Sequence, residues 1–296
     1  MNQRWRDRRE SYRPAGEPIQ TAAYEVAAIA SDNVAKTFVT AHHYSGTYPA
    51  ARFRFGLYHR AELVGVAVFS HPCNDAVLTN VFPIPARDAV ELGRFVLLDQ
   101  VPGNGESWFI ARCFEQLQGQ VAGVVSYSDP EPRTTAAGEV VHPGHVGTIY
   151  QATNGVYLGR ARSQWLRLLP DGTVFSHRAE QKIRNREKGW RYAASTLEQL
   201  GADELGEQDG AAWLAAWLPQ LTRKFRHAGN HKYAWALDRA MRRHLPTTLA
   251  YPKKHVEEPL LLAPRNSPTH GDTEHRRSGA VRAGDADHPR AGALRL

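Results

Sequence analysis

The feature that most constrains the fold of this chain is a glycine-rich turn between a strand pattern and a helix pattern. Residues 89–98, AVELGRFVLL, are typical of a β-strand, and residues 106–117 repeat apolar side chains at the spacing of one helix face. The turn between them reads QVPGNG. Backbone N–H groups converge at such a turn and the helix dipole adds partial positive charge, so the unit predicts an anion-binding loop. An ordinary Pro-Gly-Asn-Gly turn is the alternative.

Periodicity places further elements around this unit. Residues 53–58 and 63–69 are β-rich and joined by four polar residues, which predicts a hairpin, and residues 34–41 predict a helix capped from Ser31 to Asn33. We also expect strands over residues 77–82 and 121–127. The expected class is α+β, with a mostly antiparallel central sheet flanked by helices.

The ends of the chain differ from its middle. Residues 1–20 are polar and arginine-rich, and residues 256–296 lack hydrophobic periodicity, so we expect a disordered basic arm and a disordered tail. Between them we expect a core over residues 21–160 and a basic extension over 161–255. Two distant cysteines argue against a disulfide framework, and the absence of a long apolar run predicts a soluble, intracellular protein.

Positive charge is concentrated in one segment. Residues 160–255 hold 18 Lys and Arg against 9 Asp and Glu, whereas residues 1–159 hold 13 against 15. Aromatic residues are interleaved with these cations, which favours a polyanionic partner, above all nucleic acid. A basic face kept for solubility is the alternative.

Within this segment, two groups are candidates for DNA contact. A helix expected over residues 178–190 would carry cations at i, i+4 and i+8, which suits a phosphate backbone. Residues 222–235 mix cations with aromatics that could hold the backbone or stack a base. The candidates are Arg178, Lys182, Arg186, Arg223, Lys224, Lys232 and Tyr233. A hairpin around residues 164–176 would extend the sheet, and an apolar helix is expected over residues 213–221.

Polar side chains gather after the strand at residues 121–127. Ser126 and Tyr127 end that strand, and alternation should send one of them into a cleft. Asp129 is the first candidate for a general base or for a hydrogen-bond acceptor that orients the reacting amino group, with an Asx turn before Pro130 as the alternative. A helical pattern then carries Tyr150 and Asn154 at i, i+4 spacing, so the two would share a face. Tyr150 could act as a general acid or pack as a half-buried residue.

Two resemblances join these patterns. The turn matches the Gln-x-x-Gly-x-Gly pyrophosphate loop of GNAT acyltransferases, which implies that coenzyme A is held by Gln100, Val101, Gly103, Asn104 and Gly105. The segments HHYSGTYP (42–49), ELGRFVLLD (91–99), SYSDP (126–130), GHVGTIYQATNGVYLG (144–159), NHKYAWAL (230–237) and YPKK (251–254) resemble the Mom DNA-modification proteins of Mu-like bacteriophages. This second resemblance covers residues 36–254, with residues 131–142 as an insertion.

The resemblance implies a GNAT-like fold and a phage enzyme in the cytoplasm of a bacterial host. Such an enzyme places a carbamoylmethyl group on adenine N6 in double-stranded DNA, which protects the DNA from restriction. An acetyl-coenzyme A-like donor and iron are implied as well. Because the carbamoylmethyl group is attached through carbon, ordinary acyl transfer does not give this product. His43 matches the family motif.

Several alternatives stay open at this level. Asp129 with His42, His43, His142 or His145 would suit a non-haem iron site, although their spacing is not that of a recognised ligand pair. A GNAT-type N-acyltransferase acting on a protein or small amine and a catalytically silent nucleic-acid-binding protein are the other function classes. The sequence does not determine the metal, the true donor, the target motif or the oligomeric state.

Overall fold

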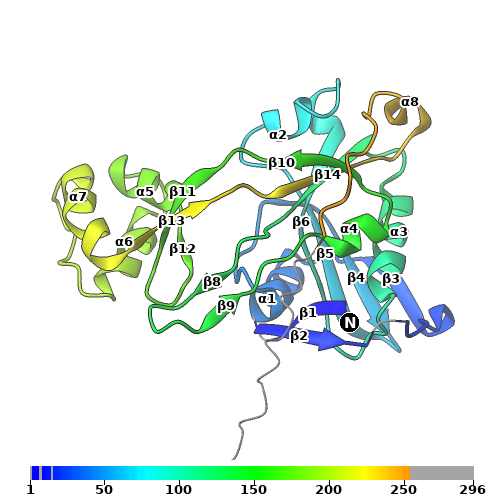
Figure 1. Cartoon of the computed structure of the whole chain (residues 1–296), viewed down its shortest axis with the longest axis horizontal. Helices are drawn as coiled ribbons and strands as arrows, with labels where there is room; N and C mark the ends of the chain where they lie inside the picture. Colours follow the sequence, from blue (N-terminus) through cyan, green and yellow to red (C-terminus); the bar gives the residue numbers. More distant parts are fainter. Residues whose placement is uncertain (1, 7–8, 15, 254–296) are drawn as a thin grey trace, which may run out of the picture. The chain divides into compact units, whose positions relative to one another are not determined.

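A seven-stranded mixed sheet forms the centre of the protein (Figure 1). The computed structural model describes residues 2–6, 9–14 and 16–253. The strand order is β10-β14-β7-β6-β5-β4-β3, and all neighbours are antiparallel except β6 and β7. The strands are β3 (Tyr24–Ala28), β4 (Ala51–His59), β5 (Glu62–Ser70), β6 (Ala89–Leu97), β7 (Gly123–Ser128), β10 (Val156–Arg160) and β14 (His231–Ala236). The α+β class with a mostly antiparallel sheet is therefore confirmed.

Helices cover both faces of this sheet. On one face, α3 (Gly105–Leu117) buries Phe109 and Ile110 in the largest hydrophobic cluster. On the other face, α1 (Asp32–His42) and the short α2 (Ala76–Thr79) pack in separate clusters. The remaining short elements are η1 (Thr21–Ala23), η2 (Ala86–Asp88), α4 (Thr148–Ala152) and α8 (Arg239–Arg242). None of the helices in the described ranges has the length and apolarity that a membrane span requires.

The central strands β6 and β7 separate soon after they begin. Their parallel pairing consists of three residue pairs and ends at Glu91 and Val125. Two residues later, β6 bulges at Gly93, since Val68 pairs with Arg94 while Phe69 pairs with Leu92. The bulge changes the direction of the rest of β6, so that β6 and β7 are no longer neighbours there.

The N-terminus forms a hairpin of β1 (Asn2–Arg6) and β2 (Arg9–Arg13). The disordered arm expected over residues 1–20 is therefore wrong for its described part. The hairpin is held by a buried arginine, Arg4, which pairs with Glu106 of α3. Local periodicity could not reveal this contact because its partners lie 102 positions apart.

Residues 164–227 build a lobe with its own sheet and core. The strands β11 (Gln164–Leu168), β12 (Val174–Phe175) and β13 (Arg223–His227) pair with one another and not with the central sheet. Three helices complete it: α5 (His177–Arg184), α6 (Trp190–Glu198) and α7 (Gly210–Leu221). Their apolar faces form a separate hydrophobic cluster. The predicted hairpin is present, but it does not extend the central sheet.

Three other local expectations need correction. Residues 77–82 are not a strand, because this apolar run forms α2 and the turn after it. The helix expected over residues 178–190 ends at Arg184, and the helical pattern around Tyr150 ends at Ala152. Residues 131–142 contain a small hairpin, β8 (Arg133–Thr134) with β9 (Val140–His142). The tail expected over residues 256–296 lies outside the described residues.

Candidate functional site

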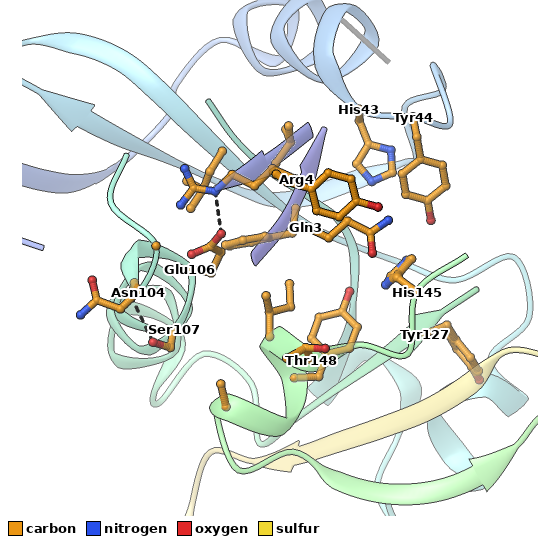
Figure 2. Close-up of a pocket in the computed structure, with 18 of the residues that line it drawn as sticks. Gln3, Arg4, His43, Tyr44, Asn104, Glu106, Ser107, Tyr127, His145 and Thr148 are labelled. Atoms are coloured by element: carbon orange, nitrogen blue, oxygen red, sulfur yellow. Dashed lines mark hydrogen bonds and ion pairs between the residues drawn. The ribbon is translucent and has the colours of Figure 1, made fainter. Parts of the chain in front are cut away.

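A cavity of about 390 Å³ opens where β6 and β7 diverge (Figure 2). Its volume is in the range of small-molecule sites. The wall combines the far half of β6, the start of α3, the α4 region, Tyr127 of β7, the end of α1 and the N-terminal hairpin. Polar members of this wall include Gln3, Tyr12, His43, Tyr44, Ser107, Tyr127, His145, Thr148 and Tyr150. Arg4 and Glu106 line the cavity as an ion pair, so it offers hydroxyl, imidazole and amide groups together with one pair of opposite charges.

Ser126 lies at the fork, the point after Glu91 and Val125 where β6 and β7 stop pairing. Its side chain is fully buried, and its hydroxyl donates to the Leu92 carbonyl at 2.9 Å, one residue beyond the last ladder pair. The Ser126 hydroxyl also lies close enough to Tyr150 to lower the pKa of that tyrosine. Ser126 thus links β6, β7 and α4 behind the cavity wall.

Tyr150 is the tyrosine that this fork positions. Burial raises the pKa of its hydroxyl, while the nearby Ser126 hydroxyl acts in the opposite direction. Gly147, with φ of 74°, precedes α4, and a Cβ there would lie 2.8 Å from the Tyr150 ring. Only glycine combines that backbone conformation with the close approach. Tyr150 stays protonated at neutral pH and can donate a proton.

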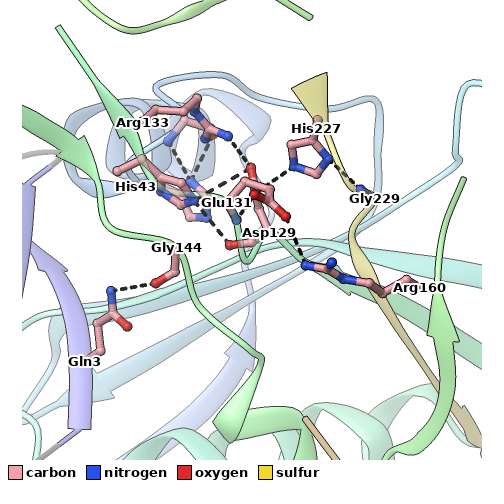
Figure 3. A network of polar contacts seen from close by, with 11 residues as sticks. Gln3, His43, Asp129, Glu131, Arg133, Gly144, Arg160, His227 and Gly229 are labelled. Atoms are coloured by element: carbon pink, nitrogen blue, oxygen red, sulfur yellow. Dashed lines mark hydrogen bonds and ion pairs between the residues drawn. The ribbon is translucent and has the colours of Figure 1, made fainter. Parts of the chain in front are cut away.

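Asp129 is the centre of an ionic network behind the wall (Figure 3). Its carboxylate accepts from Arg133 and, at 2.9 Å, from His227. Burial alone would raise the Asp129 pKa, but the His227 hydrogen bond and the Arg133 charge outweigh it and hold the pKa well below its usual range. The carboxylate also accepts from the Glu131 amide at 3.1 Å, so the Asx turn is present. Such a carboxylate is a weak base, which speaks against Asp129 as the proton acceptor.

The Asp129 backbone connects this network to the cavity. Its carbonyl accepts from the His145 amide at 2.7 Å and lies 3.3 Å from the His142 ring nitrogen. Tyr44 stacks on His142 and on His43, with ring centroids 4.6 and 4.3 Å apart. Asp129 therefore positions cavity residues through its neighbours.

These rings are kept uncharged. Burial lowers the pKa of His142 to about 3 and lowers that of His43, with further contributions from nearby arginines. Burial raises the pKa of Tyr44. At neutral pH this side of the cavity offers neutral hydrogen-bonding groups.

Glu91 is a carboxylate that the sequence analysis did not single out. It lies at the last pair of the β6–β7 ladder, and burial raises its pKa although Arg94 acts against the shift. Its charge raises the pKa values of Tyr127 and Tyr150, which both line the cavity. Glu91 does not itself line the cavity, but it lies at the end of the ladder where β6 and β7 separate, and its proton affinity is raised. An acidic residue in the middle of an apolar strand pattern was the available signal.

The other predicted catalytic residues separate into two groups. Tyr127 and His43 line the cavity. Asn154 does not share the Tyr150 face, because α4 has ended and Asn154 has φ of 57°. It lines a second cavity beside Trp235 instead. Asn154 is therefore corrected from a site residue to a turn residue.

The predicted phosphate loop approaches the cavity from the α3 side. Gly103 and Asn104 line it, Val101 is fully buried, and Gly105 begins α3, while Gln100 lies in the preceding turn. The Asn104 side chain accepts from the Ile19 amide at 2.8 Å. The sequence analysis missed that Glu106 and the N-terminal hairpin complete this wall.

The iron site suggested by resemblance was tested against the side chains present. Within residues 2–6, 9–14 and 16–253, no group of three or more His, Cys, Asp or Glu side chains is arranged to hold a metal ion. The Asp129 carboxylate is engaged by Arg133 and His227. The described residues therefore do not fit such a site.

The helix candidates for DNA contact are engaged in the lobe itself. Arg178 pairs with Glu187 at 2.6 Å. Arg186 lies beyond the end of α5 with φ of 51°, stacks over Trp190 at 4.0 Å and bonds to a backbone carbonyl. The expected stripe with Lys182 does not form, because the helix ends before Arg186.

The candidates in residues 222–235 also divide. Arg223 and Lys224 are exposed on β13. Tyr233 is fully buried and donates its hydroxyl to the Val146 carbonyl, so it is not available to stack a base. Lys232 is half-buried, with its ammonium 6.0 Å from the Tyr127 ring.

The fold and site define an α+β protein whose central sheet forks around a ligand-sized cavity. A family model described as the Mom protein family matches residues 23–253, so the chain belongs to that family. The membership makes it a DNA-modification protein of the Mom type, as the resemblance implied. No curated protein matches the chain.

The Asp129 network predicts a pH-dependent loss of stability. An ionised Asp129 with a lowered folded pKa stabilises the protein above its unfolded pKa of about 3.9, and this contribution disappears as the pH falls through the folded pKa. Asp129→Asn should lower the free energy of unfolding at pH 7 by roughly 3 kcal/mol, because Arg133 is left uncompensated. Denaturant titration should also show a flatter pH dependence below about pH 4. Exposed Asp88→Asn is the control, and equal stability of both variants would contradict the assignment.

Proposed function

We propose that this protein is a phage DNA-modification enzyme that places a carbamoylmethyl group on adenine N6 in duplex DNA. The observation that supports it best is the cavity at the β6–β7 fork in a chain of the Mom family. A base reaches such an enclosed site only after it is extruded from the duplex. Aromatic and neutral polar side chains on the walls away from the Arg4–Glu106 pair suit an uncharged base.

The proposed chemistry is a displacement at carbon. Adenine N6 is a poor nucleophile because its lone pair is delocalised into the ring, so the site must align it and accept its proton. N6 attacks the methylene carbon of a carbamoylmethyl donor, the bond to the leaving group breaks, and a proton relay carries the N6 proton to Glu91, which lies outside the cavity wall. Tyr150 gives its proton to the leaving group. The raised pKa of Glu91 suits a proton acceptor, and Tyr150 is protonated at neutral pH and so has a proton to give.

Other residues orient the reactants in this proposal. His43 and Tyr44 present uncharged groups to the base or donor, and His145 lines the same wall. Ser126 and Asp129 act as positioning residues through Tyr150 and His145. In this proposal, uncharged side chains orient the reactants and a single carboxylate, Glu91, accepts the proton.

Substitution of Glu91 tests the chemistry. Expression of the wild-type protein in a bacterium, followed by digestion of the DNA to nucleosides, should give adenosine heavier by one carbamoylmethyl group on mass spectrometry. Glu91→Gln should reduce this product roughly 100-fold or more, and Tyr150→Phe should also reduce it. Glu115→Gln, on the exposed part of α3, is the control.

The pH profile provides a second readout. With purified protein, the wild-type rate should fall as the pH drops through the raised pKa of Glu91, and Glu91→Gln should lack this acidic limb. Unmodified DNA from soluble wild-type protein would refute the proposed function. A fully active Glu91→Gln variant would refute the assignment of the base.

The DNA backbone is proposed to lie on the exposed face of β13 and β11. Lys224 and Arg226 are exposed there, and Arg226 pairs across the strands with Trp165, whose exposed fraction is 58%. Cations that flank an exposed aromatic ring suit phosphates next to a base or sugar. Arg223 lies on the same strand and donates to the Thr134 carbonyl at 2.8 Å.

Salt dependence tests this surface. The double variant Lys224→Ala/Arg226→Ala should weaken binding to duplex DNA and lower the slope of log K against log salt by about 2, one unit for each lost phosphate contact. Arg87→Ala/Arg112→Ala removes the same charge from surfaces outside the lobe and should leave the slope near the wild-type value. Equal slopes for both variants in a fluorescence anisotropy titration would contradict this surface and show that the DNA binds elsewhere on the protein.

A further inference from the structure

The N-terminal hairpin places a buried guanidinium against the predicted phosphate loop (Figure 2). Arg4 is 3% exposed and makes four hydrogen bonds there. It donates to the carboxylate of Glu106 at 2.7 Å, to the carbonyls of Leu98 and Pro102 at 3.0 and 2.8 Å, and to the carbonyl of Val101. The groups that converge at this turn are therefore acceptors that surround a cation.

A phosphate needs the opposite arrangement. It is bound by N–H groups and by the positive end of a helix. Here the amides of Val101 and Gly105 donate to carbonyls of the same turn at 3.1 and 2.9 Å. Glu106, 6% exposed, puts a carboxylate in the first turn of α3. Without Arg4, this carboxylate and three carbonyls would repel a pyrophosphate.

Gly105 also does not leave space for a ligand. A Cβ at Gly105 would lie 2.4 Å from a methyl group of Val101, so the space that glycine leaves is filled by the protein's own side chain. In a phosphate loop, a glycine lets the ligand approach the backbone. Gly105 instead lets Val101 pack against the start of α3.

Further contacts tie the arm to both sides of the loop. Ser11 donates to the Asp99 carboxylate at 2.8 Å, Arg13 donates to the Asp99 carbonyl, and the Ile19 amide donates to Asn104 at 2.8 Å. Gln3 and Tyr12 of the same arm line the cavity. The arm is thus a wall of the cavity as well as a cover for the loop.

We infer that the Arg4–Glu106 pair stands where a pyrophosphate would bind, and that the cavity takes a small donor without a phosphate. Coenzyme A does not fit this site, because its diphosphate would have to displace Arg4 and then face Glu106. The hairpin is a fixed wall that selects donors by size and charge. That the ligand is a donor rests on the proposed function. The shape of the cavity and the position of the Arg4–Glu106 pair do not depend on DNA.

Calorimetric titration with coenzyme A and acetyl-coenzyme A tests this inference without DNA. The wild-type protein should show no saturable binding up to ~1 mM of either compound. The double variant Arg4→Met/Glu106→Leu removes both charges together, which avoids an isolated buried charge, and it should also show no binding. Arg112→Met/Glu115→Leu removes an exposed pair on the same helix as the control.

Each outcome decides the question. Saturable binding to the wild type would overturn the inference directly, whatever the variant does. Binding to the Arg4→Met/Glu106→Leu variant alone would also overturn it, because the hairpin would then be a displaceable plug over a working phosphate site. The DNA nucleoside assay is separate, so failure here leaves the proposed adenine chemistry standing.

Discussion

The site depends on the point where β6 and β7 stop pairing. Three parallel ladder pairs hold the strands together, after which the bulge at Gly93 re-aims β6. The buried hydrogen bond from Ser126 to Leu92 satisfies a carbonyl that the ladder no longer reaches. Because backbone groups in a protein interior require partners, this side-chain bond allows the sheet to open at its centre without losing its core. The cavity, α4 and the N-terminal hairpin are all arranged around that opening.

The walls of the cavity differ in charge. Burial keeps Tyr44, His43 and His142 uncharged, and Asp129 is neutralised behind them by Arg133 and His227. On the α3 side a second ion pair, Arg4 with Glu106, closes the loop. Carboxylates whose partners are supplied by the protein are fixed structural charges. Glu91, with its raised pKa, is the one that suits proton transfer in our account.

Sequence patterns predicted several strands of the central sheet and the helices α1 and α3 that pack on its two faces. The strands around residues 53–69 and 89–98 and the helix at 106–117 formed as expected, since periodicity and burial agree there. The run at 77–82 was predicted as a strand because a short apolar segment does not distinguish strand from helix. The N-terminal hairpin was missed because its polar residues are ordered by Glu106, a partner far along the chain.

The sequence predicted which residues lie near the cavity better than it predicted what each residue does there. Of the predicted site residues, Tyr127, Tyr150 and His43 line the cavity, whereas Ser126 and Asp129 do not. Roles depend on which groups neutralise each other, and sequence spacing does not show that Arg133 and His227 engage Asp129. For the same reason, the letters of the predicted phosphate loop do not show that its carbonyls accept from Arg4.

The central claim is that adenine is modified in the cavity at the fork, and a cavity-filling substitution tests it most directly. Thr148 is an exposed residue at the start of α4 that lines this cavity, so Thr148→Trp should block it while the fold is kept. Val174→Trp, in the separate lobe, is the matched control. Nucleoside mass spectrometry should detect carbamoylmethyl adenosine with the wild type and the control and none with Thr148→Trp, at equal melting temperatures. Wild-type levels of modified adenosine with Thr148→Trp would contradict the account.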